Sequence, residues 1–144
     1  INDRLDVALA LDAAGVHLAG HSLPTAAARR VLGSGKLLGV STHSVEEARC
    51  AAEDGADFIV FGPVFTTPSK VVYGPPQGLQ HLTAVVRAVR VPVIAIGGID
   101  HTNLPQVVQA GAYGVAMIRA VLAAPDPYKA TQQLRAALAA ASQV

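Results

Sequence analysis

Short aliphatic runs that alternate with helical patterns are the feature that most constrains the fold of this chain. The runs are too short for helices and too continuous for half-exposed strands, so they predict buried parallel strands. They cover residues 15–18, 37–40, 58–61, 92–96 and 114–118. Apolar residues at helical spacing predict helices over residues 3–14, 24–32, 45–54, 79–89, 103–110 and 127–141.

The alternation predicts an α/β fold with a parallel sheet, either open and doubly wound or closed as a barrel. Two helix starts carry their own signals. Ser44 with Glu47 forms a capping box, and Asp126 precedes Pro127 as an N-cap. A complete (β/α)₈ barrel takes about 250 residues, so five strands in 144 residues would be an unclosed part of one. In both architectures function lies where strands end and helices begin.

Composition excludes several classes of protein. A formal net charge of +1 is too small to indicate a basic surface that binds nucleic acid. No apolar run approaches the ~20 residues that a helix needs to cross a bilayer. The one cysteine, Cys50, cannot form an internal disulfide, and its Ala-rich surroundings predict a small core residue. These features predict a cytoplasmic protein. The chain begins at Ile1 without methionine, and its first residues resemble the end of a strand, so we expect a fragment.

Two strand ends have the chemistry of a phosphate site. A hydroxyl-rich loop over residues 61–70 ends in Lys70, whose charge would neutralise part of a phosphate, although an ordinary polar turn would have the same composition. Gly97 and Gly98 follow the fourth strand and precede a helix. Paired glycines there allow a phosphate to approach the backbone, and a tight turn with positive φ is the alternative.

Four further residues are candidates from position. Asp3 follows an expected strand, where it could bind Mg²⁺ or cap the next helix, and position alone favours the cap. Ser41 follows the second strand and is the expected ligand contact there. No second ligand completes a transition-metal site around His17 or His21. We therefore expect His17 to be a hydrogen-bonded interior residue, whereas His21 at a strand end could act as an acid or base.

Taken together, five segments closely resemble the thiamine phosphate synthase/TenI family in order and spacing. They are residues 1–4 (Ile-Asn-Asp-Arg), 15–18 (Gly-Val-His-Leu), 39–44 (Gly-Val-Ser-Thr-His-Ser), 62–70 (Gly-Pro-Val-Phe-Thr-Thr-Pro-Ser-Lys) and 95–99 (Ala-Ile-Gly-Gly-Ile). The resemblance implies a (β/α)₈ TIM barrel, of which residues 1–144 would be one partial domain. Two strand-helix units and most of a third strand would precede Asn2.

A synthase of this family joins an aminopyrimidine methyl diphosphate to a thiazole phosphate, with Mg²⁺ assisting the departure of pyrophosphate. The resemblance implies a role for each matching position. Asn2 and Asp3 would bind diphosphate and Mg²⁺, Ser41 and Lys70 the diphosphate, Thr67 and Ser69 the thiazole phosphate side, and the amide of Gly98, beside Gly97, the thiazole phosphate.

The chain departs from the synthase pattern at two positions, Ser22 and Arg119, and from the tautomerase pattern at Pro63, where it agrees with synthases. Ser22 stands where synthases usually have an aspartate that is a second metal ligand, so we expect a weakened Mg²⁺ site. Arg119 stands near the usual phosphate-binding serine and could contact that phosphate directly. TenI-like thiazole tautomerases have a histidine where this chain has Pro63, although His21 could substitute as the base.

We therefore expect a thiamine phosphate synthase-like transferase that acts on small phosphorylated substrates and has no nucleic-acid or membrane partner. A tautomerase and a non-catalytic thiazole-phosphate-binding relative are the alternatives. The sequence leaves open whether the chain forms a homo-oligomer.

Overall fold

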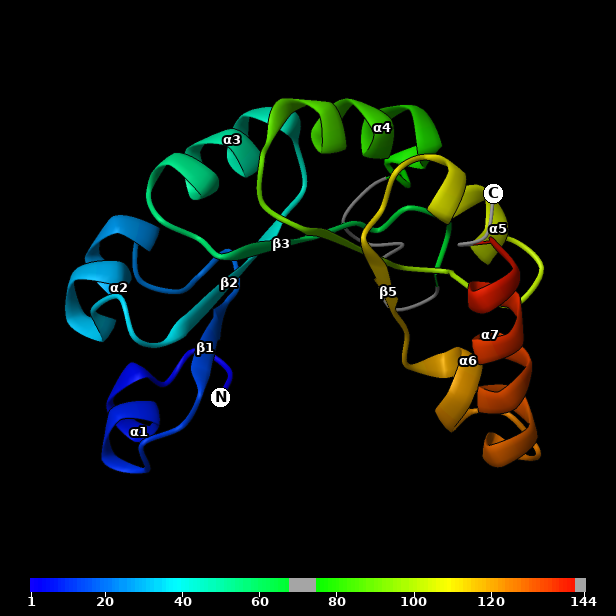
Figure 1. The fold of residues 1–144 in the computed structure, drawn as a ribbon, viewed down its shortest axis with the longest axis horizontal. Coiled ribbons are helices and arrows are strands. Elements are labelled where there is room, and N and C mark those ends of the chain that lie inside the picture. Colours follow the sequence, from blue (N-terminus) through cyan, green and yellow to red (C-terminus); the bar gives the residue numbers. More distant parts are fainter. Residues whose placement is uncertain (68–74, 142–144) are drawn as a thin grey trace.

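A computed structural model describes residues 1–67 and 75–141 of the chain. These residues form one parallel sheet in which the strand order follows the chain (Figure 1). The strands are β1 (Gly15–Leu18), β2 (Leu37–Thr42), β3 (Phe58–Phe61), β4 (Val93–Ile96) and β5 (Gly114–Ala116). All five predicted strands are therefore present, and the parallel α/β prediction is confirmed.

Helices connect the strands and cover one side of the sheet. They are α1 (Leu5–Ala10), α2 (Thr25–Leu32), α3 (Val45–Glu53), α4 (Gly78–Ala88), α5 (Leu104–Gln109), α6 (Arg119–Leu122) and α7 (Pro127–Ala141). In Figure 1 the sheet curves, with α2, α3 and α4 along its convex side and the concave side open. No described helix combines the length and apolar content needed to span a membrane.

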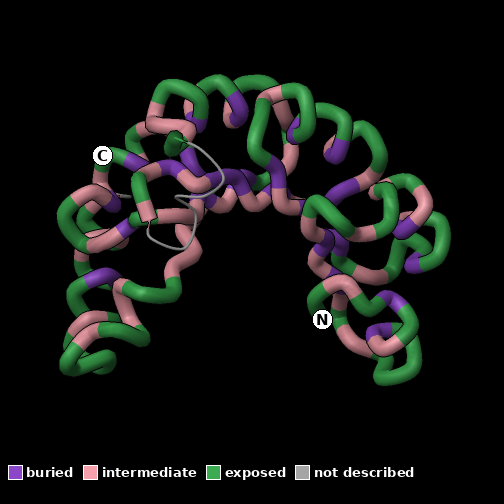
Figure 2. Tube along the Cα trace, turned by 180° about the vertical axis from the view of Figure 1, so that it is seen from behind, coloured by how far each residue is buried: buried purple, intermediate pink, exposed green. Residues whose placement is uncertain are grey.

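The hydrophobic core lies between the convex face of the sheet and the helices. Alternate strand residues point to opposite faces, and residues paired in register share a face. Buried side chains from the strands meet buried helix residues in this layer, where purple segments gather in Figure 2. The buried strand residues are Val16, Leu18, Leu38, Val40, Ile59, Phe61, Val93 and Ala95. The intervening residues, including His17 and Ser41, therefore face the concave side.

Several predicted boundaries need correction. The helix predicted over residues 3–14 is only Leu5–Ala10, because Asp3 and Asp12 both have positive φ, which an α-helix does not accommodate. The strand predicted over 114–118 ends at Ala116, and Ile118 instead precedes the short helix α6. Aliphatic character alone did not separate this last strand from the helix that follows it.

The predicted helix caps are confirmed. The backbone N–H of Glu47 donates to the Ser44 side chain at 3.1 Å, and the Glu47 carboxylate accepts from the N–H of His43 at 2.7 Å. The Asp126 carboxylate accepts from the N–H of Lys129 at 3.0 Å. The prediction for Cys50 was wrong, because this residue is exposed on α3.

Candidate active site

The candidate residues that the structure describes gather at one edge of the sheet. In a parallel sheet the carboxyl ends of the strands meet at the same edge, where α/β proteins place their ligands. Asn2 and Asp3 lie beside the end of β1, His21 and Ser22 follow β1, Ser41 lies near the end of β2, Thr67 lies in the loop after β3, and Gly97 and Gly98 directly follow β4.

Asp3 lies beside the sheet and does not cap α1. Asn2 forms an isolated parallel bridge with His17, and the N–H of Asp3 donates to the His17 carbonyl at 2.9 Å. The segment before Asp3 thus runs along β1 as a strand would. The N-cap of α1 is Arg4, which makes no side-chain capping bond, so the capping interpretation of Asp3 was wrong.

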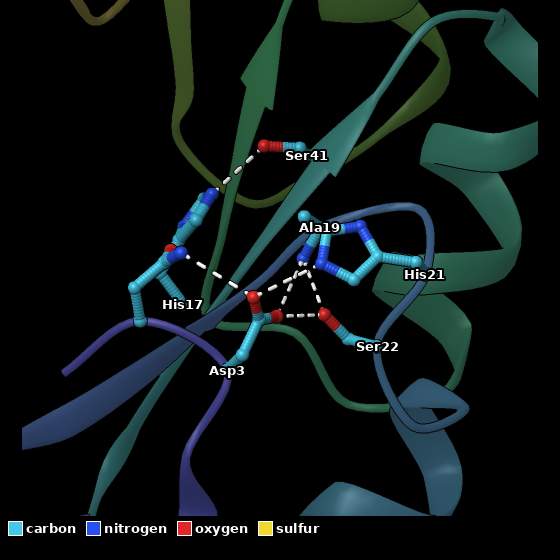
Figure 3. Close-up of polar contacts among 7 residues, drawn as sticks. Asp3, His17, Ala19, His21, Ser22 and Ser41 are labelled. Atoms are coloured by element: carbon cyan, nitrogen blue, oxygen red, sulfur yellow. Dashed lines mark hydrogen bonds and ion pairs between the residues drawn. The ribbon is translucent and has the colours of Figure 1, made fainter.

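Instead, the Asp3 carboxylate is the centre of a polar cluster (Figure 3). Its Oδ1 accepts from the Ser22 hydroxyl and, at 3.4 Å, from the N–H of Ala19. Its Oδ2 lies 3.3 Å from His21 Nε2 and 3.4 Å from Asn2 Nδ2. The Ser22 hydroxyl is the main reason that the pKa of Asp3 is lowered. Asp3 is therefore an ionised carboxylate at neutral pH.

This cluster has few of the ligands that a protein metal site needs. The described ranges contain no group of three or more His, Cys, Asp and Glu side chains able to hold a metal ion. Mg²⁺, however, commonly takes only one or two carboxylates and completes its shell with substrate phosphate and water. Asp3 fits that donor set, since both contacts to Oδ2 are long and the His21 side chain is 82% exposed.

Ser41 is linked to His17 across neighbouring strands. His17 Nε2 lies 2.8 Å from Ser41 Oγ, and the His17 ring stacks on Phe58 with centroids 6.1 Å apart. Burial is the main cause that lowers the pKa of His17, so the ring is neutral at neutral pH. The predicted hydrogen bond of His17 is confirmed, but the residue is only partly buried on the concave face, and its contact with a candidate site residue was missed. Alternation shows which residues of one strand share a face, but only the register of β1 against β2 brings His17 next to Ser41.

The paired glycines meet the requirements of a tight turn. Gly97 and Gly98 have φ of 101° and 64°, and a Cβ on Gly98 would lie 2.6 Å from the carbonyl oxygen of Thr66. The loop after β3 packs here, since the N–H of Phe65 donates to the Gly97 carbonyl at 3.0 Å. The turn alternative therefore explains these glycines, and phosphate binding by their amides stays a prediction.

The remaining predicted site residues are Thr67, Ser69, Lys70 and Arg119. Thr67 is the last described residue of its loop, and Ser69 and Lys70 lie outside the described residues. Arg119 is the exposed first residue of α6. The roles predicted for these four residues stay predictions.

A cavity of about 370 Å³ lies beside the Asp3 cluster, at the ends of β1 and β2. Its lining includes the candidate residues Ser22 and Ser41, but it continues along α2 and α3 to Thr25, Cys50 and Asp54. The hollow therefore extends along the helix side of the sheet, and Ser22 and Ser41 border only one end of it.

Comparison with known proteins gives a consistent result. Residues 1–121 match the family model described as thiamine monophosphate synthase. The chain is 51% identical over 138 residues to a putative thiamine-phosphate synthase of Geobacter sulfurreducens, covering 96% of this chain and 65% of the relative. It is 53% identical over 134 residues to a thiamine-phosphate synthase of Roseiflexus castenholzii, covering 93% and 59%. The chain thus spans about three fifths of these relatives' length.

A solved structure supports the fold. The thiamine phosphate pyrophosphorylase from Pyrococcus furiosus superimposes with a TM-score of 0.86 at 39% identity, over 97% of this chain and 66% of that one. The predicted TIM-barrel-like α/β fold is therefore confirmed.

Proposed function

The chain belongs to the thiamine monophosphate synthase family, and we propose that it carries the carboxyl-edge active site of a thiamine-phosphate synthase. The observation that carries the proposal is identity of 51% and 53% to relatives named as such synthases, over almost the whole of this chain. The reaction joins an aminopyrimidine methyl diphosphate to a thiazole phosphate. The bond from the pyrimidine methylene carbon to the diphosphate oxygen breaks, and pyrophosphate leaves with the electron pair. The thiazole nitrogen then donates its lone pair to form the new C–N bond.

Such a reaction asks the protein mainly to stabilise a departing anion. Asp3 is the described residue suited to hold Mg²⁺ against the diphosphate, through Oδ2. When bound, the metal would neutralise negative charge that develops on the leaving group. Ser41 donates a hydroxyl hydrogen bond to the diphosphate, and Asn2 offers an amide beside it. Lys70 adds a positive charge, in keeping with the family motif that it completes.

The second substrate is assigned to the edge beyond β3 and β4. Thr67 and Ser69 bind the thiazole phosphate side, and the Gly98 amide, beside Gly97, binds the phosphate itself. The support is the packing of the β3 loop against these glycines, which holds Phe65 and Thr66 close to Gly98. Arg119 stands where the family usually has a serine, and its positive charge is suited to contact the same phosphate.

One observation favours a tautomerase as the second candidate. The imidazole of His21 lies 3.3 Å from the Asp3 carboxylate, and a carboxylate that orients a histidine is a common arrangement for a general base. Such an enzyme needs neither diphosphate nor Mg²⁺. It would exchange thiazole ring protons with solvent in the presence of a chelator, with His21 as its base.

The substitution Ser22→Asp tests the metal part of the proposal. Without metal, the new carboxylate would face Asp3, and repulsion between the two should lower the melting temperature. When Mg²⁺ is present, the new carboxylate acts as a second charged ligand. We therefore expect pyrophosphate release to reach half its maximal rate at about tenfold lower Mg²⁺ concentration. Thermal unfolding with and without Mg²⁺ gives a readout that does not need turnover.

Ser34→Asp is the matched control, because Ser34 is exposed and lies in the connection between α2 and β2. This variant should keep the parent's Mg²⁺ response. A Ser22→Asp variant with the parent's Mg²⁺ response in both melting temperature and rate would remove Asp3 and Ser22 from the metal site.

A further inference from the structure

We propose that His17 is a positioning residue that orients the Ser41 hydroxyl so that it donates to the diphosphate group of the substrate. The inference rests on the proposed function, since it assigns a partner to a residue already placed at the diphosphate. The side chain that it concerns, His17, acts on the substrate only through Ser41.

The register of the sheet brings the two side chains together. His17 pairs with Gly39, and Ser41 lies two residues further along β2, so both side chains point to the concave face. The resulting contact between His17 Nε2 and Ser41 Oγ is 2.8 Å long (Figure 3). Ser41 lies nearer to the carboxyl edge, where a ligand binds, and His17 lies behind it.

The His17 ring is held in place on its far side. It stacks on Phe58 at an interplanar angle of 27°, across the position of Gly39. A Cβ at Gly39 would lie 2.2 Å from the Phe58 ring and 2.8 Å from His17 Nδ1, so the stack requires glycine there. Backbone bonds also fix His17, because its N–H donates to Ile1 and its carbonyl accepts from Asp3. A fixed ring can select one rotamer of a hydroxyl that otherwise rotates freely.

The direction of the hydrogen bonds follows from the ligand. Diphosphate oxygens near neutral pH chiefly accept hydrogen bonds, so Ser41 must donate its proton to them. Its oxygen is then free to accept from His17, which requires the proton of the imidazole to sit on Nε2. A neutral imidazole protonated on Nε2 supplies this donor. The Ser41 hydroxyl is thereby polarised and aimed at the anion.

Titration of inorganic pyrophosphate in the presence of Mg²⁺ tests the inference with a matched pair of variants. In His17→Gln the side-chain amide reaches about where Nε2 lies, whereas in His17→Asn it is one methylene shorter. Both lose the stack on Phe58, so their difference isolates the bond to Ser41. We expect His17→Asn to weaken pyrophosphate binding about three- to tenfold and His17→Gln to restore most of it.

A double-mutant cycle completes the test. Ser41→Ala should weaken binding about 10- to 100-fold, and adding His17→Asn to it should change nothing further. His81→Asn, on the exposed face of α4, is the control and should bind as the parent does. Additive losses in the double variant, or equal losses from His17→Gln and His17→Asn, would overturn the positioning role while leaving the proposed function intact. A parent that binds no pyrophosphate would remove both.

Discussion

Replacing Asp3 with asparagine should lower kcat/KM for pyrophosphate release at least about 100-fold, the scale on which a group that stabilises transition-state charge contributes. Asparagine has nearly the same shape, and Asp3 is only partly buried, so the fold should be retained. What is lost is the one negative charge in a cluster of donors from Asn2, Ala19, His21 and Ser22. The remaining neutral amide is a poor ligand for Mg²⁺.

Asp6→Asn is the matched control for this experiment. Asp6 lies three residues further on, is exposed and is paired with Arg4, which holds its pKa at about 2. The control should retain the parent's rate, since the Asp6 carboxylate is bound by Arg4 and not by the donors that surround Asp3. An Asp3→Asn variant that kept a tenth or more of the parent's activity would show that Asp3 does not hold the metal.

Gly98→Ala should have the second largest effect, because it acts on both stability and thiazole phosphate binding. An alanine at φ of 64° costs roughly 1–2 kcal/mol, and its Cβ would lie 2.6 Å from the Thr66 carbonyl oxygen and 2.8 Å from the Phe65 side chain. The loop after β3 would have to move away from β4. We expect a loss of about 1–3 kcal/mol in the free energy of unfolding and at least tenfold weaker binding of thiazole phosphate.

Denaturant unfolding and ligand titration check these two effects separately. Gly35→Ala is the control, because a Cβ at Gly35 meets no atom within 4 Å and this glycine does not have positive φ. Its stability and affinity should match the parent's. If Gly98→Ala lost stability but bound thiazole phosphate as the parent does, Gly98 would have a structural role alone.

The sequence predicted the strands well because burial dominates their composition. β1 and β3 have the predicted bounds, because a glycine or an aspartate marks the start of each run and a glycine follows within two residues of its end. β5 was predicted two residues too long, because Met117 and Ile118 continue the apolar run beyond the last ladder pair, Ile96 with Ala116. Composition does not report where hydrogen bonding to a neighbouring strand stops.

The candidate site was predictable in its parts but not in its connections. Parallel topology places strand ends together, so Asp3, Ser22 and Ser41 could be assigned to one edge from the sequence. The cap interpretation of Asp3 failed because its left-handed backbone and its bond to Ser22 are long-range outcomes of packing. The link from His17 to Ser41, which are 24 residues apart in the chain, needed the register of β1 against β2, which periodicity does not supply.

The most direct test of the synthase assignment is to incubate the purified protein with the aminopyrimidine methyl diphosphate, the thiazole phosphate and Mg²⁺, and to follow the mixture by phosphorus and proton NMR. We expect thiamine phosphate and pyrophosphate to form in equal amounts, and a chelator to slow the formation of both. Exchange of thiazole ring protons in the chelator without pyrophosphate would contradict it in favour of the tautomerase. Tight binding of thiazole phosphate with no change in either substrate would contradict it in favour of a non-catalytic binding protein.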